Sequence, residues 1–253
     1  MVAVVVHVLL LIAIGAIVGG LGGLFGIGGA LIVIPVLALA FGFDQQHAQG
    51  TALVMGMPIT LVGLWRYAHR PAFDRRGAIV LALAAAPCVF VGAYFALHRA
   101  GDSLRPAFAI FLVALAAWMV VRSFLQSAAP RAPLAHRDAW TAAVGAAGGL
   151  MSGTFSSGGA AFAVPVLTTF FGYAQATAQG LALGLIAPGA LISIVTYGLA
   201  GAIDWSTGIP LAIGGMLFLK QGVALAHRLP ERLLRALFAA LLVISAIALL
   251  DHR

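Results

Sequence analysis

Long apolar stretches, separated by short clusters of arginine, glycine and proline, constrain this chain more than any other feature. A helix needs about 20 apolar residues to cross the hydrocarbon core of a bilayer. Hydrophobic residues make up 62% of the 253-residue chain and charged residues only 8%, which is too little charge to coat a soluble fold of this size. The composition therefore predicts a membrane protein with several spans. The single cysteine, Cys88, excludes a disulfide framework.

Apolar segments bounded by charges, glycine or proline predict an all-α, polytopic membrane protein. Alternation with a period of two, which a membrane β-barrel requires, is missing. The segments fall into two groups of five, which predict a first transmembrane repeat at 1–122, a polar linker at 123–138 and a second transmembrane repeat at 139–253. The predicted segments are 3–21, 29–42, 47–68, 77–98, 105–122, 139–152, 159–172, 177–199, 207–227 and 233–250.

Two of these segments, 29–42 and 159–172, are short. As helices they measure only about 21 Å, whereas the hydrocarbon core is about 30 Å thick. Each is therefore expected either to cross the membrane as a short helix or to form one arm of a re-entrant hairpin.

The two groups repeat one pattern at an offset of 130 residues, without a gap from Gly19 to Gly77. Apolar sequences of low complexity align by chance at alanine and leucine, but not at proline, glutamine, tyrosine and aspartate together. The matched pairs include Pro35 and Pro165, Gln49 and Gln179, Pro58 and Pro188, Tyr67 and Tyr197, and Asp74 and Asp204. The sequence therefore predicts an internal repeat.

Arginine predicts how the repeats are oriented. Ten arginines lie in the stretches 66–76, 122–137 and 228–235, which share one face if every segment changes sides. The positive-inside rule makes this face cytoplasmic and places both termini on the opposite, outer face of the membrane. The stretch 196–206, equivalent to 66–76, has no arginine or lysine, so equivalent loops should lie on opposite faces, as in an inverted repeat. A parallel repeat is the second-ranked alternative.

Glycine clusters before the short segments mark the first candidate site. Seven glycines lie within 19–29 and five within 148–159. Each glycine disfavours a helix interior by up to about 1 kcal/mol, so we expect the clusters to interrupt the helix. A short helix that starts after Gly28 and Gly29, or after Gly158 and Gly159, directs its first N–H groups at an anion. The two turns together predict an anion site near the membrane midplane.

Close packing of helices through small residues is the alternative role for these glycines. The four-residue spacing of Gly15, Gly19 and Gly23 suits that role as well.

Neutral side chains near the glycine turns supply further candidate donors. Gln49 and Gln179 are equivalent and lie inside the third segment of each half, where an amide can donate to an anion without adding charge. Their alternative role is an interhelical hydrogen bond. The hydroxyl candidates are Thr51, Thr154, Ser156 and Ser157. Gln45 and Gln175 lie nearer the segment ends and are expected at the membrane interface.

Three residues are candidates for gating or for a charge role. Pro58 and Pro188 are expected to break the same helix in both halves, as rigid kinks or as hinges. Lys220, the only lysine, is either a functional intramembrane cation or a side chain that snorkels toward the arginine-rich end. Asp74 and Asp204 are expected to cap the fourth segments.

Catalytic and cofactor motifs are missing: the sequence has no HExxH, GxSxG, P-loop or GxGxxG pattern and no pair of carboxylates within a predicted span. The chain is therefore predicted not to be an enzyme and to use no cofactor or metal. The predicted partners are a small anionic substrate, the lipid bilayer, a coupling ion (proton or sodium) and a second copy of the chain as a homodimer. No nucleic acid is expected.

Two duplicated elements carry a resemblance to a known family. A glycine turn followed by Pro-x-Leu reads Gly26-Ile27-Gly28-Gly29 to Pro35-Val36-Leu37, and again Ser157-Gly158-Gly159 to Pro165-Val166-Leu167. The second element reads Gly201-Ala202-Ile203-Asp204-Trp205, with a degraded copy at Pro71-Ala72-Phe73-Asp74. Over nearly its whole length the chain resembles the TauE/SafE family, although Ala30 and Ala160 stand where a third glycine is common. The resemblance implies an inner-membrane exporter or permease for small sulfur-containing anions such as sulfite, sulfoacetate or thiosulfate.

The sequence thus predicts a secondary transporter that binds a small oxyanion at two helix breaks. A channel-like anion pore and a membrane scaffold subunit without a substrate are the alternatives. An intramembrane enzyme and a cation carrier rank lower, because neither a nucleophile–base pair nor a mid-span acidic residue is visible.

Overall fold

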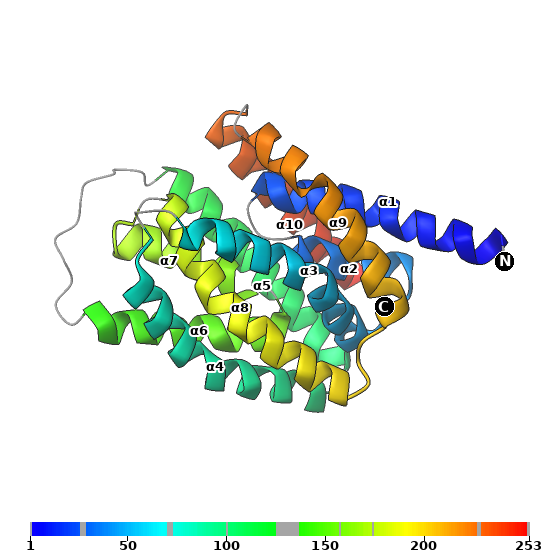
Figure 1. Cartoon of the computed structure of the whole chain (residues 1–253), viewed down its shortest axis with the longest axis horizontal. Coiled ribbons are helices and arrows are strands. Elements are labelled where there is room, and N and C mark those ends of the chain that lie inside the picture. Colours follow the sequence, from blue (N-terminus) through cyan, green and yellow to red (C-terminus); the bar gives the residue numbers. More distant parts are fainter. Residues whose placement is uncertain are drawn as a thin grey trace.

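The computed structural model describes residues 2–25, 29–69, 73–99, 101–124, 137–156, 158–173, 175–226 and 229–251. These residues form ten α-helices and no strand, which confirms the all-α prediction (Figure 1). The first half contains α1 (Val2–Phe25), α2 (Ala30–Ala40), α3 (Gln45–Ala68), α4 (Arg75–His98) and α5 (Gly101–Phe124). The second half contains α6 (Arg137–Phe155), α7 (Gly158–Phe170), α8 (Gln175–Leu199), α9 (Trp205–Ala226) and α10 (Glu231–Asp251).

The helices of the two halves keep the 130-residue offset of the sequence repeat. The helices α3, α4 and α5 begin at residues 45, 75 and 101, and α8, α9 and α10 begin at 175, 205 and 231. Most of the predicted linker lies outside the described residues, so the division at 123–138 stays a prediction.

The helices α3 and α8 run antiparallel at the centre of the bundle. The end of α3 reaches the start of α8, where the hydroxyl of Tyr67 bonds Gln179, and the end of α8 reaches the start of α3, where that of Tyr197 bonds Gln49. Equivalent elements therefore lie at opposite ends of the molecule, as an inverted repeat requires. In Figure 1, α3 and α8 cross the middle of the view between α1 and α9 on one side and α4 and α6 on the other.

The first helix of each half packs on the fourth helix of the other half: α1 on α9, and α6 on α4. Glycines make this approach close. A Cβ added to Gly15, Gly19 or Gly23 would contact the backbone of Leu211, Gly215 or Leu219, respectively. A Cβ added to the equivalent Gly145, Gly149 or Gly153 would contact Leu81, Ala85 or Val89. Each partner is also shifted by 130 residues, so the two interfaces are equivalent.

These contacts correct one prediction from the glycine clusters. The upstream glycines do not interrupt the helices, because α1 continues to Phe25 and α6 to Phe155. Their role is close helix packing, in which backbone contact with a neighbouring helix offsets the cost of glycine inside a helix.

The inner and outer helices differ in burial. Of the candidate spans, α3 and α8 are each 61% buried within their most apolar window, whereas α1, α4 and α9 are between 22% and 39% buried. The outer faces carry large exposed apolar side chains, such as Leu83, Ile17 and Leu199. Such an apolar exterior suits contact with lipid rather than water. Five helices of the described residues are long and apolar enough to cross a membrane.

The short helices α2 and α7 contain 11 and 13 residues. At 1.5 Å per residue they measure about 17 and 20 Å, so neither is long enough to span a hydrocarbon core of about 30 Å as a helix. They pack beside α3 and α8 and also contact α10 and α5 of the opposite half. This placement brings the starts of both short helices toward the centre of the bundle.

Pro58 and Pro188 do not interrupt their helices, and their roles as rigid kinks or as hinges stay a prediction. Both α3 and α8 continue through their prolines. Neighbouring helices cover these segments, which allows a spanning helix to tolerate the backbone hydrogen bond that proline removes.

Acidic caps and an ion pair define the two ends of the bundle. Asp74 accepts a hydrogen bond from the backbone N–H of Gly77, and Asp204 accepts from those of Ser206 and Thr207, which confirms both predicted caps. Arg76 pairs with Asp138, so α4 and α6 begin at the same end. This contact brings the stretch 66–76 next to the start of α6, directly after the stretch 122–137.

Candidate functional site

The turn before α2 places an uncapped helix start inside the protein. Gly29 adopts a left-handed backbone conformation (φ 79°), which a residue with a side chain rarely adopts. No side chain caps the N-terminus of α2, and Ala30 and Leu31 are 2% and 1% exposed. A buried helix end without a capping side chain leaves N–H groups available to another acceptor. The predicted Gly28 lies outside the described residues.

The turn before α7 is held close to α6 by glycines. A Cβ on Gly158 would lie 2.9 Å from the carbonyl oxygen of Met151, and one on Gly159 would lie 2.6 Å from that of Gly148. Both glycines are buried. Ser156 precedes them with a positive φ of 60°, which is uncommon for a residue with a side chain. The predicted Ser157 lies outside the described residues.

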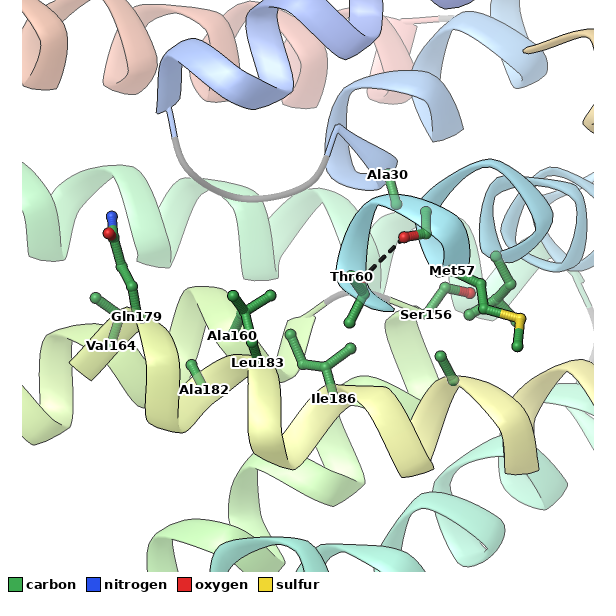
Figure 2. A pocket seen from close by; sticks show the side chains of 13 residues that line it. Ala30, Met57, Thr60, Ser156, Ala160, Val164, Gln179, Ala182, Leu183 and Ile186 are labelled. Atoms are coloured by element: carbon green, nitrogen blue, oxygen red, sulfur yellow. Dashed lines mark hydrogen bonds between the residues drawn. The ribbon is translucent and has the colours of Figure 1, made fainter. Parts of the chain in front are cut away.

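A cavity of about 30 Å³ lies between α3 and α8 (Figure 2). Ala30 at the start of α2 and Ala160 in the first turn of α7 both line it. Further lining residues are also equivalent in the repeat: Leu53 and Leu183, Gly56 and Ile186, and Thr60 and Ala190. The cavity therefore lies where the two halves meet. A cavity of this size has room for about one or two water molecules.

The polar lining of this cavity is neutral. Thr60, Ser156 and Gln179 contribute the polar side chains, and no ionisable side chain is among the described lining residues. The hydroxyl of Thr60 already donates to the carbonyl of Gly56 in its own helix, 2.9 Å away (Figure 2). Ser156 donates across helices to the carbonyl of Gln49 at 3.0 Å. The cavity thus offers amide and hydroxyl groups rather than charges.

Gln49 and Gln179 form equivalent hydrogen bonds with two tyrosines. The hydroxyl of Tyr197 donates to Oε1 of Gln49 at 3.0 Å, and that of Tyr67 donates to Oε1 of Gln179 at 2.9 Å. Each tyrosine belongs to the half opposite its glutamine. Gln49 is fully buried, and its Nε2 has no hydrogen-bond partner.

The role of the two tyrosines was missing from the sequence prediction, although the repeat alignment already contained the pair. An aromatic residue at a helix end is typical of a membrane interface. The only sequence feature that points to the tyrosine–glutamine contact is the alignment that matches Tyr67 with Tyr197 and Gln49 with Gln179.

Several predicted site residues lie away from the cavity. Thr51 is buried, and its hydroxyl oxygen accepts from the backbone N–H of Asp204 at 3.0 Å, so it ties α3 to the turn before α9. Pro58 and Pro188 are half-buried within α3 and α8 and do not line the cavity. Lys220 is exposed on α9, six residues before the end of that helix.

Gln45 is buried within the protein. It begins α3, near the segment end, it is only 3% exposed, and neither Oε1 nor Nε2 has a hydrogen-bond partner. Its predicted interfacial location concerns depth in the membrane and stays a prediction. Packing of neighbouring elements covers this helix start, which the apolar pattern of one segment does not report.

Carboxylates with altered pKa values lie at helix starts rather than at the cavity. For Asp44, burial raises the pKa, but hydrogen bonds from His47 outweigh it and hold the pKa below its usual range. For Asp204, burial again opposes the hydrogen bonds from Ser206 and Thr207, and the pKa is lowered. Within the described residues, no group of three or more His, Cys, Asp or Glu side chains is placed to hold a metal ion.

An apolar helical bundle whose outer helices surround two buried antiparallel helices, with a neutral polar cavity between them, is the fold of a polytopic membrane transporter. Sequence comparison agrees with this class and names the family. The profile of the family described as "Sulfite exporter TauE/SafE" matches residues 11–249, so the chain belongs to this family.

Relatives named as probable membrane transporters match more than nine-tenths of the chain. The probable membrane transporter protein YunE of Bacillus subtilis (strain 168) is 20% identical over 257 residues, which cover 93% of this chain and 94% of that protein. A probable membrane transporter protein of Xylella fastidiosa (strain 9a5c) is 28% identical over 243 residues, covering 92% and 91% of the two chains. One of Methanocaldococcus jannaschii is 25% identical over 257 residues, covering 95% and 94%.

Proposed function

We propose that this membrane transporter is a permease or exporter of a small sulfur-containing anion of the sulfite or organosulfonate class. The anion binds between α3 and α8, at the starts of α2 and α7. The arginine-rich loops face the cytoplasm of the inner membrane, and both termini face outward. Transport runs downhill or is coupled to a proton or sodium gradient, and a second copy of the chain completes a homodimer.

One observation supports this proposal most directly: the first turns of both short helices line one buried cavity. Ala30 and Ala160 lie there at equivalent positions, and no side chain caps α2. The start of a helix carries a positive partial charge and free N–H groups, which favour an anion. Two such starts at one cavity favour an oxyanion over a cation.

The neutral lining of the cavity also favours an oxyanion as the substrate. Gln179 and Ser156 contribute an amide and a hydroxyl to the cavity. Gln49, whose backbone carbonyl accepts from Ser156, has a buried Nε2 that is a further unpartnered donor outside the cavity lining. Amide and hydroxyl donors bind an anion without a buried cation, whose desolvation in the membrane would be costly.

The size of the cavity favours a transporter over the two alternative functions. A cavity of about 30 Å³ is too small for an open anion pore. A scaffold subunit would have no reason to bury an amide whose donor nitrogen has no partner, such as Nε2 of Gln49. Substrate entry requires α3 and α8 to separate, which matches a transporter that opens toward one side at a time.

The test uses purified protein in liposomes, with flux of radiolabelled sulfite as the readout and sulfoacetate and thiosulfate as competitors. We expect saturable sulfite flux. Gln179→Leu should reduce it about 10- to 100-fold, the effect of removing one hydrogen bond to a charged group. Gln221→Leu is the matched control, because Gln221 is exposed on α9. Flux that never saturates would favour a pore, and folded protein indifferent to all three anions would refute the proposal.

Glycine replacements are less suitable for this test. A side chain at Gly158 or Gly159 would contact the backbone of α6, so a loss of flux would report folding as much as binding.

A further inference from the structure

Tyr67 and Tyr197 extend the proposed site beyond the cavity wall. We propose that they are positioning residues: each holds a glutamine amide of the opposite half by its oxygen, so that the NH₂ group of that amide is presented to the anion. This inference rests on the proposed function, because it concerns how the same site binds its substrate.

The first argument is the reciprocal geometry. Tyr197 on α8 bonds Gln49 on α3 at 3.0 Å, and Tyr67 on α3 bonds Gln179 on α8 at 2.9 Å. The two tyrosines are equivalent in the repeat, and so are the two glutamines. The same contact therefore occurs once near each end of the antiparallel pair, with the cavity between.

The second argument is the orientation of the amide. A glutamine amide has an acceptor oxygen and a donor nitrogen, and a hydroxyl that donates to the oxygen fixes which way the amide faces. In Gln49 the oxygen is occupied by Tyr197, while the buried Nε2 has no partner. A buried donor without an acceptor is unfavourable, so it is the atom that an arriving anion would satisfy.

The third argument is that the tyrosines do not reach the cavity themselves. Gln179 and Ser156 line it, and neither tyrosine is a lining residue. Gln49 adjoins the cavity through its backbone carbonyl, which accepts from Ser156. Tyr197 is fully buried, and its hydroxyl also donates to the carbonyl of Gly153 at 3.3 Å, close to the end of α6. The tyrosines therefore act on a substrate only through the glutamines.

A glutamine held in this way offers donors and no acceptor. An anion whose oxygens are all acceptors, such as deprotonated sulfite or a sulfonate, satisfies such groups. Without the tyrosine, the amide is free to rotate and present its oxygen, which would repel the same anion.

Double-mutant cycles with sulfite binding to the purified full chain test the inference. Tyr197→Phe and Tyr67→Phe remove one hydroxyl each and keep the ring. We expect each to weaken sulfite binding about fivefold, the effect of one lost hydrogen bond. In the Gln49→Leu background, Tyr197→Phe should cause no further loss, whereas in the Gln179→Leu background it should still cause the full fivefold loss. Tyr67→Phe should show the reverse pattern.

The unfolding temperature is measured for every variant. If the hydrogen bond is purely structural, the tyrosine and glutamine substitutions should be coupled in their effects on the unfolding temperature but additive in their effects on sulfite binding. That result, or equal coupling in matched and mismatched pairs, would overturn the positioning role. Folded wild-type protein that binds no sulfite would instead overturn the proposed function.

A second variant covers the case in which Tyr197→Phe does not fold. Gln179→Glu keeps an oxygen to accept from Tyr67 at a half-buried position but has no NH₂ group. We expect it to weaken sulfite binding more than Gln179→Leu does while it retains the unfolding temperature of the wild type within a few degrees. Binding as tight as in the wild type would refute the role of the Gln179 amide as a donor.

Discussion

The hydroxyl of Tyr197 donates a hydrogen bond of 3.0 Å to Oε1 of Gln49, and both side chains are fully buried. The equivalent Tyr67 and Gln179 are only half-buried. The same hydrogen bond therefore occurs once in a buried and once in a half-buried environment. The two hydrogen bonds should contribute differently to the stability of the protein.

Tyr197→Phe should destabilise the protein more than Tyr67→Phe. Removal of the Tyr197 hydroxyl leaves the buried oxygen of Gln49 without a donor, which costs about 1–3 kcal/mol. Gln179 is only half-buried, so its oxygen is less desolvated and Tyr67→Phe should cost less than half as much. Thermal unfolding in detergent, followed by circular dichroism, checks the order, and a larger effect at Tyr67 would contradict it.

Gly19→Ala should destabilise the packing of α1 on α9, whereas Gly20→Ala should not. A Cβ at Gly19 would contact the backbone of Gly215, which cannot move without the helix. A Cβ at Gly20 would find Phe218 no closer than 3.9 Å. Overpacking at the first position should cost about 1–3 kcal/mol, whereas alanine at the second should be neutral or slightly stabilising. Unfolding temperatures of the two variants check this, and equal effects would contradict the close approach of the helices.

The cap at Asp204 should contribute stability that depends on pH. Its pKa is lowered in the folded protein, so its contribution is complete above its ordinary value of 3.8 and is lost as the pH falls through the folded value. Asp204→Ala should lower the stability by about 0.5–2 kcal/mol at neutral pH. The difference in unfolding temperature between wild type and variant should shrink below about pH 4. A constant difference from pH 7 to pH 3 would contradict an ionised cap.

Single cysteines should report the proposed orientation. In a Cys88→Ala background, His69→Cys and Ala200→Cys place exposed thiols after α3 and after α8. A membrane-impermeant maleimide should label residue 200 in intact cells and residue 69 only after permeabilisation. Labelling of both from outside would contradict an inverted repeat with a cytoplasmic arginine face.

The sequence was sufficient for the helices because their determinants are local. Apolar length, the caps at Asp74 and Asp204, and the matches at Pro, Gln, Tyr and Asp predicted ten helices in two copies. The glycine clusters were misinterpreted in part. Helix propensity alone favours a break at Gly19 and Gly149. The helices continue because each glycine packs against a neighbouring helix, which for α1 is α9, nearly 200 residues away in the sequence.

The site itself depended more on the tertiary structure. The equivalence of Gln49 and Gln179 was visible in the sequence, but the contact of each with a tyrosine of the other half was not. A repeat alignment shows which residues are equivalent, but it does not show which residues of one half contact the other half.

Apolar segments and their charges by themselves determined a polytopic membrane protein with an inverted repeat, since the bilayer requires helices of a certain length and biases arginine to one side. Only the tertiary structure decided which glycines pack helices, which donors remain unpartnered and where the short helices start. Those properties depend on contacts between distant segments, and antiparallel packing of α3 against α8 brings the glutamine of one half to the tyrosine of the other.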